Sequence, residues 1–315
     1  MLMAAVSSMP AATQEAKVAP DIFTVCSYSS QDCLDNIDAE IAKAEPQSAL
    51  WYELTLVKLD SLFALQHSEP LWQATSKLVL DQTAPAPFRA RLYIYHAKML
   101  VTNQSKLQAE HYLEKAVQLL EQMNRSAPNP MTIILLVNVQ TYVRGEPLKG
   151  YETLLNLEAK FSRSHDELMK YELYNNLAHG AHFLKRFEES QQHREKALTA
   201  IQKTNNKAKL AEGHYNLARA LAYREQWAAV EPHLIYAEKY YQQIGDQLLT
   251  ALARMHLAES LYRQGKMQQA SAMFATVDLN KVPSYVNNHL ERIQALFNQA
   301  PQSEVRSTPA GKPQH

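Results

Sequence analysis

Leucine and alanine recur along residues 174–277 in a pattern that repeats every 40 residues. The segments 176–178, 216–218 and 256–258 each end in a Leu-Ala pair. Nine positions after each Ala comes a bulky apolar residue, and three positions later a small or β-branched one; these are Phe187, Trp227 and Met267, then Ser190, Val230 and Ala270. A fixed period of this length indicates an array of structural repeats.

Each unit of this array is predicted to be a pair of antiparallel helices. Within 171–184, the residues Tyr174, Leu177, Ala178 and Ala181 recur at helical spacing, so they share one face. The alanine methyl group allows a second helix to approach closely. We expect the bulky residue that opens this second helix to fill the gap beside the alanine.

The repeated positions resemble those of the tetratricopeptide-repeat family, which has a Leu-Gly/Ala pair in the first helix and an aromatic residue opening the second. The matching residues are Leu177, Ala178, Phe187, Ser190 and Ala197; Leu217, Ala218, Trp227, Val230 and Ala237; and Leu257, Ala258, Gly265, Met267, Ala270 and Phe274. Units of 40 residues are longer than the usual length of about 34, so extra turns are expected at 204–206 and 244–246. The resemblance implies an all-α, right-handed α-solenoid and a scaffold whose ligand the family alone does not specify.

The same offsets continue towards the N-terminus. Equivalent points of successive units fall near positions 97, 138, 178, 218 and 258. Before them, apolar spacing predicts a helix after Cys33, a longer one over 48–66 and another opened by Pro70. We therefore predict five units and one degenerate N-terminal helix pair, forming one solenoid over residues 21–300.

A last helix is predicted over 285–298, where apolar residues again recur at helical spacing. It has no partner helix in the sequence, so we expect it to cap the array by covering Met267 and Phe274. Residues 301–315 are polar and contain proline, and are predicted to be a disordered tail.

Two features near the N-terminus favour export to an oxidising compartment. Residues 1–20 are rich in Ala, Ser and Met and resemble the end of a secretory signal peptide, although they lack a basic segment. Cys26 and Cys33 are the only cysteines and lie seven positions apart, a spacing that a disulfide can close. The alternatives are a disordered N-terminal tail and two buried thiols. We predict a periplasmic location, and a cytoplasmic one otherwise.

Composition narrows the classes of function. The formal net charge of 0 is unlike the basic surplus of a nucleic-acid-binding surface. The sequence contains no run of 18 apolar residues, the length that a membrane-spanning helix needs. The 7 glycines are scattered, and no phosphate loop, HExxH, GxSxG or paired CxxC motif occurs. We therefore expect neither an enzyme nor a cofactor.

The 12 histidines leave a metal site as an alternative. His179 and His182 lie three positions apart on one predicted helix, and His193 and His214 lie on neighbouring helices. Imidazoles at such spacing can share a metal ion, but half-exposed helix faces commonly carry histidine. We predict no metal site.

The resemblance also implies where a ligand binds. In the family, the first helices of successive units line a concave groove, and the groove positions map here onto aromatic, imidazole and charged residues. They are Asn175, His179, His182 and Phe183; Tyr215, Arg219 and Tyr223; and Met255, Glu259, Tyr262 and Arg263. Such side chains suit an extended peptide or a helix, through stacking on tyrosine and charge-assisted bonds from arginine. The Lys and Asn set of the family's carboxylate clamp is incomplete.

Three functions are consistent with this sequence. The first is a non-catalytic adaptor that binds a partner protein or peptide in the groove, in the bacterial envelope. The second is a sensory or regulatory module that closes on a peptide or small ligand. The third is a metal-binding or enzymatic role for His179, His182 and His214. Because no segment of these 315 residues resembles a signalling output domain, the adaptor is favoured over the sensor.

Overall fold

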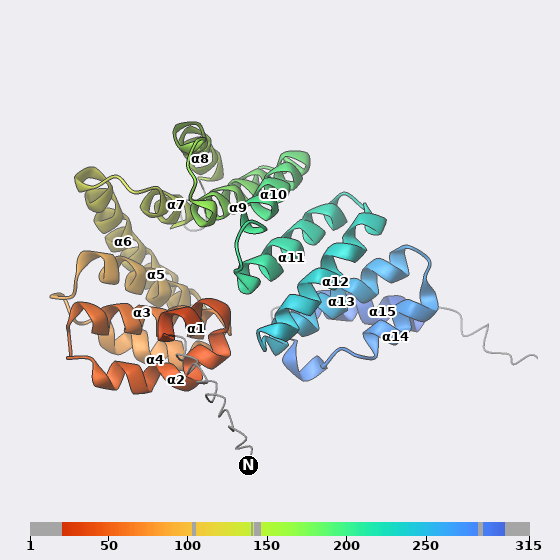
Figure 1. The fold of residues 1–315 in the computed structure, drawn as a ribbon, viewed down its shortest axis with the longest axis horizontal. Helices are drawn as coiled ribbons and strands as arrows, with labels where there is room; N and C mark the ends of the chain where they lie inside the picture. The colour runs from red at the N-terminus through yellow and green to blue at the C-terminus, as the bar shows by residue number, and fades with distance from the viewer. Residues whose placement is uncertain (1–20, 103–104, 140, 142–145, 283–285, 300–315) are drawn as a thin grey trace, which may run out of the picture.

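The computed structural model describes residues 21–102, 105–139, 141, 146–282 and 286–299. The predictions for residues 1–20 and 301–315 lie outside the described residues. Within the described ranges, every regular element is a helix. Neighbouring helices pack in antiparallel order into one curved array, which runs from α1 to α15 in Figure 1. The predicted all-α solenoid is therefore confirmed.

The helices follow one another with short connections. Their bounds are α1 Ile22–Tyr28, α2 Ser30–Lys43, α3 Ala49–Ala64, α4 Ser68–Leu78, α5 Ala86–Thr102, α6 Lys106–Ser126, α7 Pro130–Val139, α8 Pro147–Phe161, α9 Glu167–Phe183, α10 Phe187–Ile201, α11 Lys207–Tyr223, α12 Trp227–Gln243, α13 Gln247–Arg263, α14 Met267–Phe274, the 3-10 helix η2 Leu279–Lys281, and α15 Asn287–Gln299. None of these described helices combines the length and the apolar character needed to cross a membrane.

The period of 40 residues sets the start of each helix in the regular part of the array, α9 to α14. The first helices of its three units begin at residues 167, 207 and 247, and the second helices at 187, 227 and 267. The N-caps repeat as well: Asp166, Asn206 and Asp246 each accept a hydrogen bond from the backbone N–H three residues later, at 2.9, 3.0 and 2.9 Å. The period thus fixes local backbone structure as well as packing.

The turns inside these units also repeat. Lys185, Glu225 and Gly265 have positive φ angles of 60°, 57° and 77°. A residue in this left-handed conformation ends a helix and redirects the chain into the next one. Glycine adopts it without strain, whereas Lys185 and Glu225 adopt it at a cost that the packing of the two helices offsets.

The alanines of the repeat pattern have the predicted role. Ala178, Ala218 and Ala258 are at most 1% exposed, and the Ser190 hydroxyl donates a hydrogen bond to the Ala178 carbonyl at 2.9 Å. A side chain longer than a methyl group would separate the helices at these points.

Two of the three bulky residues that open the second helices differ from the prediction, whereas the third, Trp227, is partly buried against the core. Phe187 and Met267 are 37% and 41% exposed, so the expectation that they fill the gap beside the alanine is wrong. The start of the second helix lies at the edge of the array. There Phe187 stacks against Tyr223 of the next unit, with ring centroids 5.8 Å apart and an interplanar angle of 5°.

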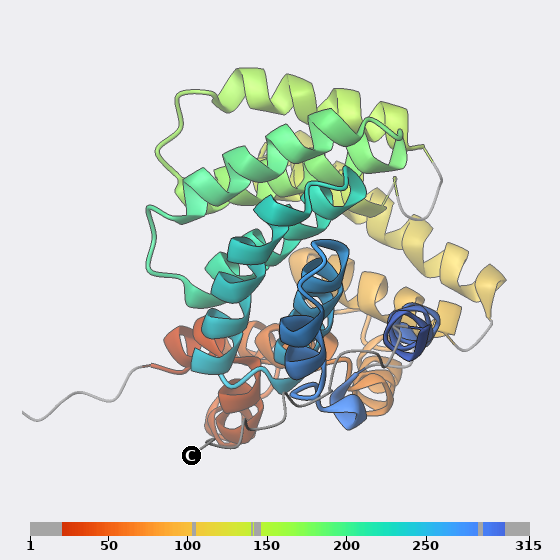
Figure 2. The ribbon, with the colours of Figure 1, turned by 90° about the vertical axis from the view of Figure 1, so that its right-hand side faces the viewer.

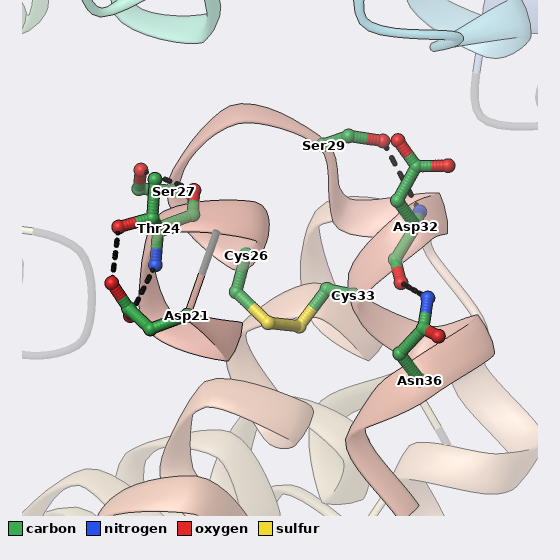
Figure 3. The surroundings of a disulfide bond; sticks show 8 residues. All are labelled: Asp21, Thr24, Cys26, Ser27, Ser29, Asp32, Cys33 and Asn36. Atoms are coloured by element: carbon green, nitrogen blue, oxygen red, sulfur yellow. Dashed lines mark hydrogen bonds between the residues drawn. A yellow bond between two sulfur atoms is a disulfide. The ribbon is translucent and has the colours of Figure 1, made fainter. Parts of the chain in front are cut away.

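The N-terminal part, α1 to α8, is less uniform, with helices of 7 to 21 residues. A disulfide joins Cys26 in α1 to Cys33 in α2, with the Cα atoms 4.5 Å apart (Figure 3). Asp21 and Ser29 cap these two short helices through their side chains. The helix α1 also contacts α11, so the curved array brings its first helix against its regular part. Figures 1 and 2 both show the first and last helices on the side of the curve away from α8.

The last helix, α15, packs against α13 and α14 as a cap. Ile293 is fully buried, and the Phe297 ring lies 4.9 Å from Phe274 and 5.6 Å from Tyr262, measured between centroids. The predicted contact with Phe274 is present. Met267, which we also expected to be covered, is exposed because it stands at the far edge of α14.

Candidate partner-binding face

Three of the eleven predicted groove residues are buried. Asn175 is 6% exposed, Tyr215 is 9% exposed and Met255 is completely buried. Tyr215 and Met255 belong to the hydrophobic core between the units, where Tyr215 meets Tyr241 edge-on. A partner on the surface cannot reach these side chains in this conformation, so they are removed from the candidate site.

Asn175 belongs instead to a polar network between α9, α10 and α11. Arg194 of α10 donates a hydrogen bond to the side-chain oxygen Oδ1 of Asn175, and its second guanidinium nitrogen lies 3.1 Å from Nε2 of His179. The Asn175 amide donates to Glu212 of α11 at 3.3 Å. Lys209 pairs with both Glu212, at 2.9 Å, and Glu172, at 2.8 Å. The network ties two successive units together.

Burial keeps the imidazole of this network neutral. Desolvation, and then the charge of Arg194, lowers the pKa of His179 to about 3. The pKa of Glu212 is also lowered: burial opposes this shift, but the charge and hydrogen bond of the adjacent Lys209 ammonium, together with the charge of Arg194, outweigh it. His179 is therefore a neutral acceptor for Arg194 at physiological pH, and its predicted role in the groove is replaced by one in holding the fold.

Exposed aromatic side chains gather where α9 and α11 end. Phe183 is 49% exposed and Tyr223 is 54% exposed, beside the exposed Phe187. His182 lies against this group, with its ring 4.6 Å from Tyr223 and 5.4 Å from Phe187 between centroids. We call these four residues, His182, Phe183, Phe187 and Tyr223, the aromatic edge. Such an amount of aromatic surface in water is typical of a contact site.

A guanidinium group lies next to the aromatic edge. Arg219 stands one helical turn before Tyr223 and is exposed, and it forms no hydrogen bond or ion pair with another residue in the described ranges. Burial, and then the charge of Arg219, lowers the pKa of His182. The edge thus presents neutral aromatic rings and one unpaired positive charge.

The third unit differs because α15 covers part of its face. Glu259 lies 3.2 Å from His289 of α15, and Tyr262 packs on Phe297 of the same helix. Arg263 remains exposed, but it lies 3.8 Å from Glu259 and its guanidinium stacks 5.6 Å from the Trp227 ring centroid. The mapped positions of this unit are consequently engaged by the protein itself.

Comparison with known proteins agrees with this architecture. No family model and no curated protein matches the chain. Among solved structures, it resembles a Rap protein complexed with competence and sporulation factor, with 10% identity and a TM-score of 0.56 over 88% of this chain and 75% of that one. The apo form of RapI gives 13% identity and a TM-score of 0.53 over 78% and 72% of the two chains.

A third structure, the APC/C hetero-tetramer Cut9-Hcn1, gives 14% identity and a TM-score of 0.54, covering 89% of this chain and 48% of that one. These neighbours are tetratricopeptide-repeat proteins. The chain folds as a tetratricopeptide-repeat solenoid. At these identities the likeness concerns the fold and does not extend to the ligand.

The solenoid separates the histidines considered as a metal site. His179 faces Arg194 and His182 faces the aromatic edge, whereas His193 is 2.9 Å from the Tyr151 hydroxyl. His214 lies 3.0 Å from His233, with the two Nδ1 atoms facing each other. Their ligand atoms do not converge, so the hypothesis of a site formed by His179, His182 and His214 is not supported by the geometry.

Sequence reasoning assigned Phe187 to the fold and so missed its place in the aromatic edge. The family pattern names this position as a packing residue, and the repeat alone does not distinguish a buried ring from an edge ring. A usable signal was present: Phe187 follows Phe183 by four positions and His182 by five across a turn of only Leu184, Lys185 and Arg186. Three rings around so short a turn cannot all point inward.

Proposed function

We propose that this protein is a non-catalytic adaptor that holds a partner protein or peptide against the aromatic edge and Arg219. The observation that carries the proposal is the exposure of Phe183, Phe187 and Tyr223 beside a guanidinium with no partner of its own. The rest of the predicted groove is buried, held in the polar network or covered by α15, except Arg263, which is exposed but lies against Glu259 and the Trp227 ring. Docking is therefore confined to the ends of α9 and α11.

The chemistry of this face suits a particular kind of segment. Large, rigid rings with few rotatable bonds provide contact area at low entropic cost, and they pack well against apolar or aromatic side chains. Arg219 would pair with a carboxylate of the partner through a charge-assisted hydrogen bond. We propose that the partner presents an apolar side chain next to Asp or Glu. Rap protein, which shares the fold, has been solved complexed with competence and sporulation factor.

The absence of recognisable catalytic motifs in the sequence supports a non-enzymatic role. Tetratricopeptide-repeat folds commonly act as scaffolds, and the polar groups of Asn175, Arg194 and Glu212 are engaged in ties between helices. His193 and His214, the most buried of the histidines first considered for chemistry, each bond to a structural neighbour, the Tyr151 hydroxyl and His233.

We further propose that the protein acts in an oxidising compartment, the bacterial periplasm. The disulfide between Cys26 and Cys33 supports this location, since such bonds persist where thiols are not kept reduced. The apolar segment at the start of the sequence is consistent with export.

Paired substitutions test the docking site. The double variant Arg219→Ala, Tyr223→Ala should bind the partner protein that the wild type captures from its host with an affinity lower by about tenfold or more. The control carries Tyr236→Ala and Lys239→Ala, which alter an equally exposed tyrosine and a lysine on α12, and it should bind as the wild type does. Circular dichroism must show unchanged helix content in both. Equal binding by the two double variants would contradict the proposed site.

The contact between α1 and α11 favours a second candidate, a regulatory module that changes shape on binding. A ligand that needs the space beside α11 would compete with α1 and loosen the curve. Small-angle scattering should then show an increase in the radius of gyration when the captured partner is added as a short peptide. An unchanged scattering profile at saturating peptide would contradict the regulatory module and favour an adaptor that binds without changing shape.

A further inference from the structure

A cluster of potential metal ligands lies between α13 and the cap helix α15, away from the aromatic edge. Its members are His256 and Glu259, one helical turn apart on α13, and His289 on α15. It is the one group of three or more potential ligand side chains that comes together within the described part of the chain. The docking function leaves these residues unexplained.

The three ligand atoms surround one point. Nε2 of His289 lies 3.2 Å from Nδ1 of His256 and 3.2 Å from Oε2 of Glu259, and the remaining pair is 3.9 Å apart. Three ligands on a tetrahedral ion at about 2.1 Å would be separated by about 3.4 Å. The observed triangle thus has nearly the size that a coordinated ion requires, before any movement of the side chains.

We propose that His256, Glu259 and His289 bind one divalent transition-metal ion, with zinc as the ion that two imidazoles and one carboxylate favour. The side chains are 20%, 13% and 23% exposed, so the group is sheltered but open on one side. Water would complete a four-coordinate site from that side. The ion would replace a shared proton as the link between α13 and α15.

The surrounding charges determine how such a site would form. Arg292 contacts the other ring nitrogen of His289, and Arg263 lies 3.8 Å from the other oxygen of Glu259. Both arginines are exposed and sit on the outer atoms of the ligands, so the inner atoms remain directed at each other. Because a metal-bound imidazole carries its proton on the outer nitrogen, Arg292 must turn towards solvent when the ion binds.

Binding would fasten the cap of the solenoid. α15 is otherwise attached through the apolar contacts of Leu290, Ile293 and Phe297, and an ion shared between its first turn and α13 would oppose fraying of the C-terminal end. This role requires neither the aromatic edge nor a partner, so it can be tested independently of the adaptor function.

The test uses the untagged full chain, stripped with a chelator and titrated with zinc chloride by isothermal calorimetry. The wild type should bind one equivalent and show a higher Tm with zinc than without it. His289→Gln and Glu259→Gln keep hydrogen-bonding groups but lose a good ligand, so each should weaken zinc binding more than about tenfold and abolish the rise in Tm. Helix content by circular dichroism should match the wild type.

His233→Ala is the matched control, because His214 and His233 form an imidazole pair at a similar distance, 3.0 Å, without a carboxylate. This variant should bind zinc as the wild type does. Absence of one-to-one binding in the wild type would overturn the proposal, and so would wild-type affinity in both His289→Gln and Glu259→Gln. Loss of binding in His233→Ala alone would assign the ion to the other histidine pair.

Discussion

The regular part of the solenoid, α9 to α14, and the N-terminal part, α1 to α8, are stabilised in different ways. In the regular part an Asp or Asn N-cap, a left-handed turn and a buried alanine return every 40 residues. In the N-terminal part the helices differ in length, and a disulfide fastens the first two. Where the structure repeats, positions that do not repeat stand out as candidates for function.

Equivalent positions of the three regular units show this difference. Positions 178, 218 and 258 are all alanine and all buried. Positions 183, 223 and 263 are Phe, Tyr and Arg, and positions 179, 219 and 259 are His, Arg and Glu. A shared role in close helix packing fixes the first set. The other two sets are free to vary, and they hold Phe183 and Tyr223 of the aromatic edge, Arg219 and one ligand of the proposed metal site.

The largest expected effect comes from a cavity in the regular part. Leu177 is completely buried against its neighbours, so Leu177→Ala should lower the free energy of unfolding by about 2–5 kcal/mol, from lost burial and the cavity left behind. Urea unfolding followed by circular dichroism measures it. Leu168→Ala is the control on the same helix: Leu168 is 44% exposed, and its loss should change stability by less than about 0.5 kcal/mol. Similar costs for the two variants would contradict the assigned packing.

Reduction of the disulfide should destabilise the N-terminal part of the solenoid. The bond closes a loop between residues seven positions apart, which corresponds to about 2–3 kcal/mol of chain entropy in the unfolded state. Because stability in solenoids is local, reductant should speed amide hydrogen exchange in α1 and α2. It should leave exchange unchanged in α9, α10, α12 and α13, which lie outside the contact between α1 and α11. Equal acceleration in both parts would show that the array unfolds as one unit and that the contrast between its parts is unfounded.

Acid should destabilise the regular part first, by less than the cavity or the loss of the disulfide. The pKa of His179 is lowered to about 3 and that of His214 to about 4 by burial, compared with 6.5 for an ordinary histidine. At pH values between these lowered pKa values and 6.5, the unfolded state binds more protons than the folded state. The contribution of the two histidines to stability is therefore full above about pH 6.5 and falls as the pH drops towards 4. His179→Gln and His214→Gln should flatten this decline, measured as Tm against pH. An unchanged slope in the double variant would rule out these histidines as its source.

The fold was predictable from sequence because its signals are local. The Leu-Ala pairs at 177, 217 and 257 predicted the helix faces, and the caps at Asp166, Asn206 and Asp246 lie at the same period. The candidate site was predictable only in part. Tyr223, Phe183 and Arg219 were identified because they occupy family groove positions, and the structure leaves them exposed.

The errors arose where contacts are distant in sequence. Met255 occupies a groove position but is buried because the neighbouring units close over it. Tyr262 and Glu259 are covered by α15, whose docking no repeat pattern specifies. Likewise, His289 follows His256 by 33 positions and joins it only through the packing of the cap. A mapping from one idealised unit treats all units alike, so it cannot anticipate how the end of the array differs.

The most direct test of the central claim, that partners dock at the aromatic edge, is site-specific photo-crosslinking in the native host. A photoreactive phenylalanine analogue placed at Tyr223 should yield a discrete crosslinked species on illumination, and Arg219→Ala in the same chain should abolish it. The analogue placed at Tyr236, which is 49% exposed on α12, should yield none. A species formed from position 236 and not from 223, or one insensitive to Arg219→Ala, would contradict the account.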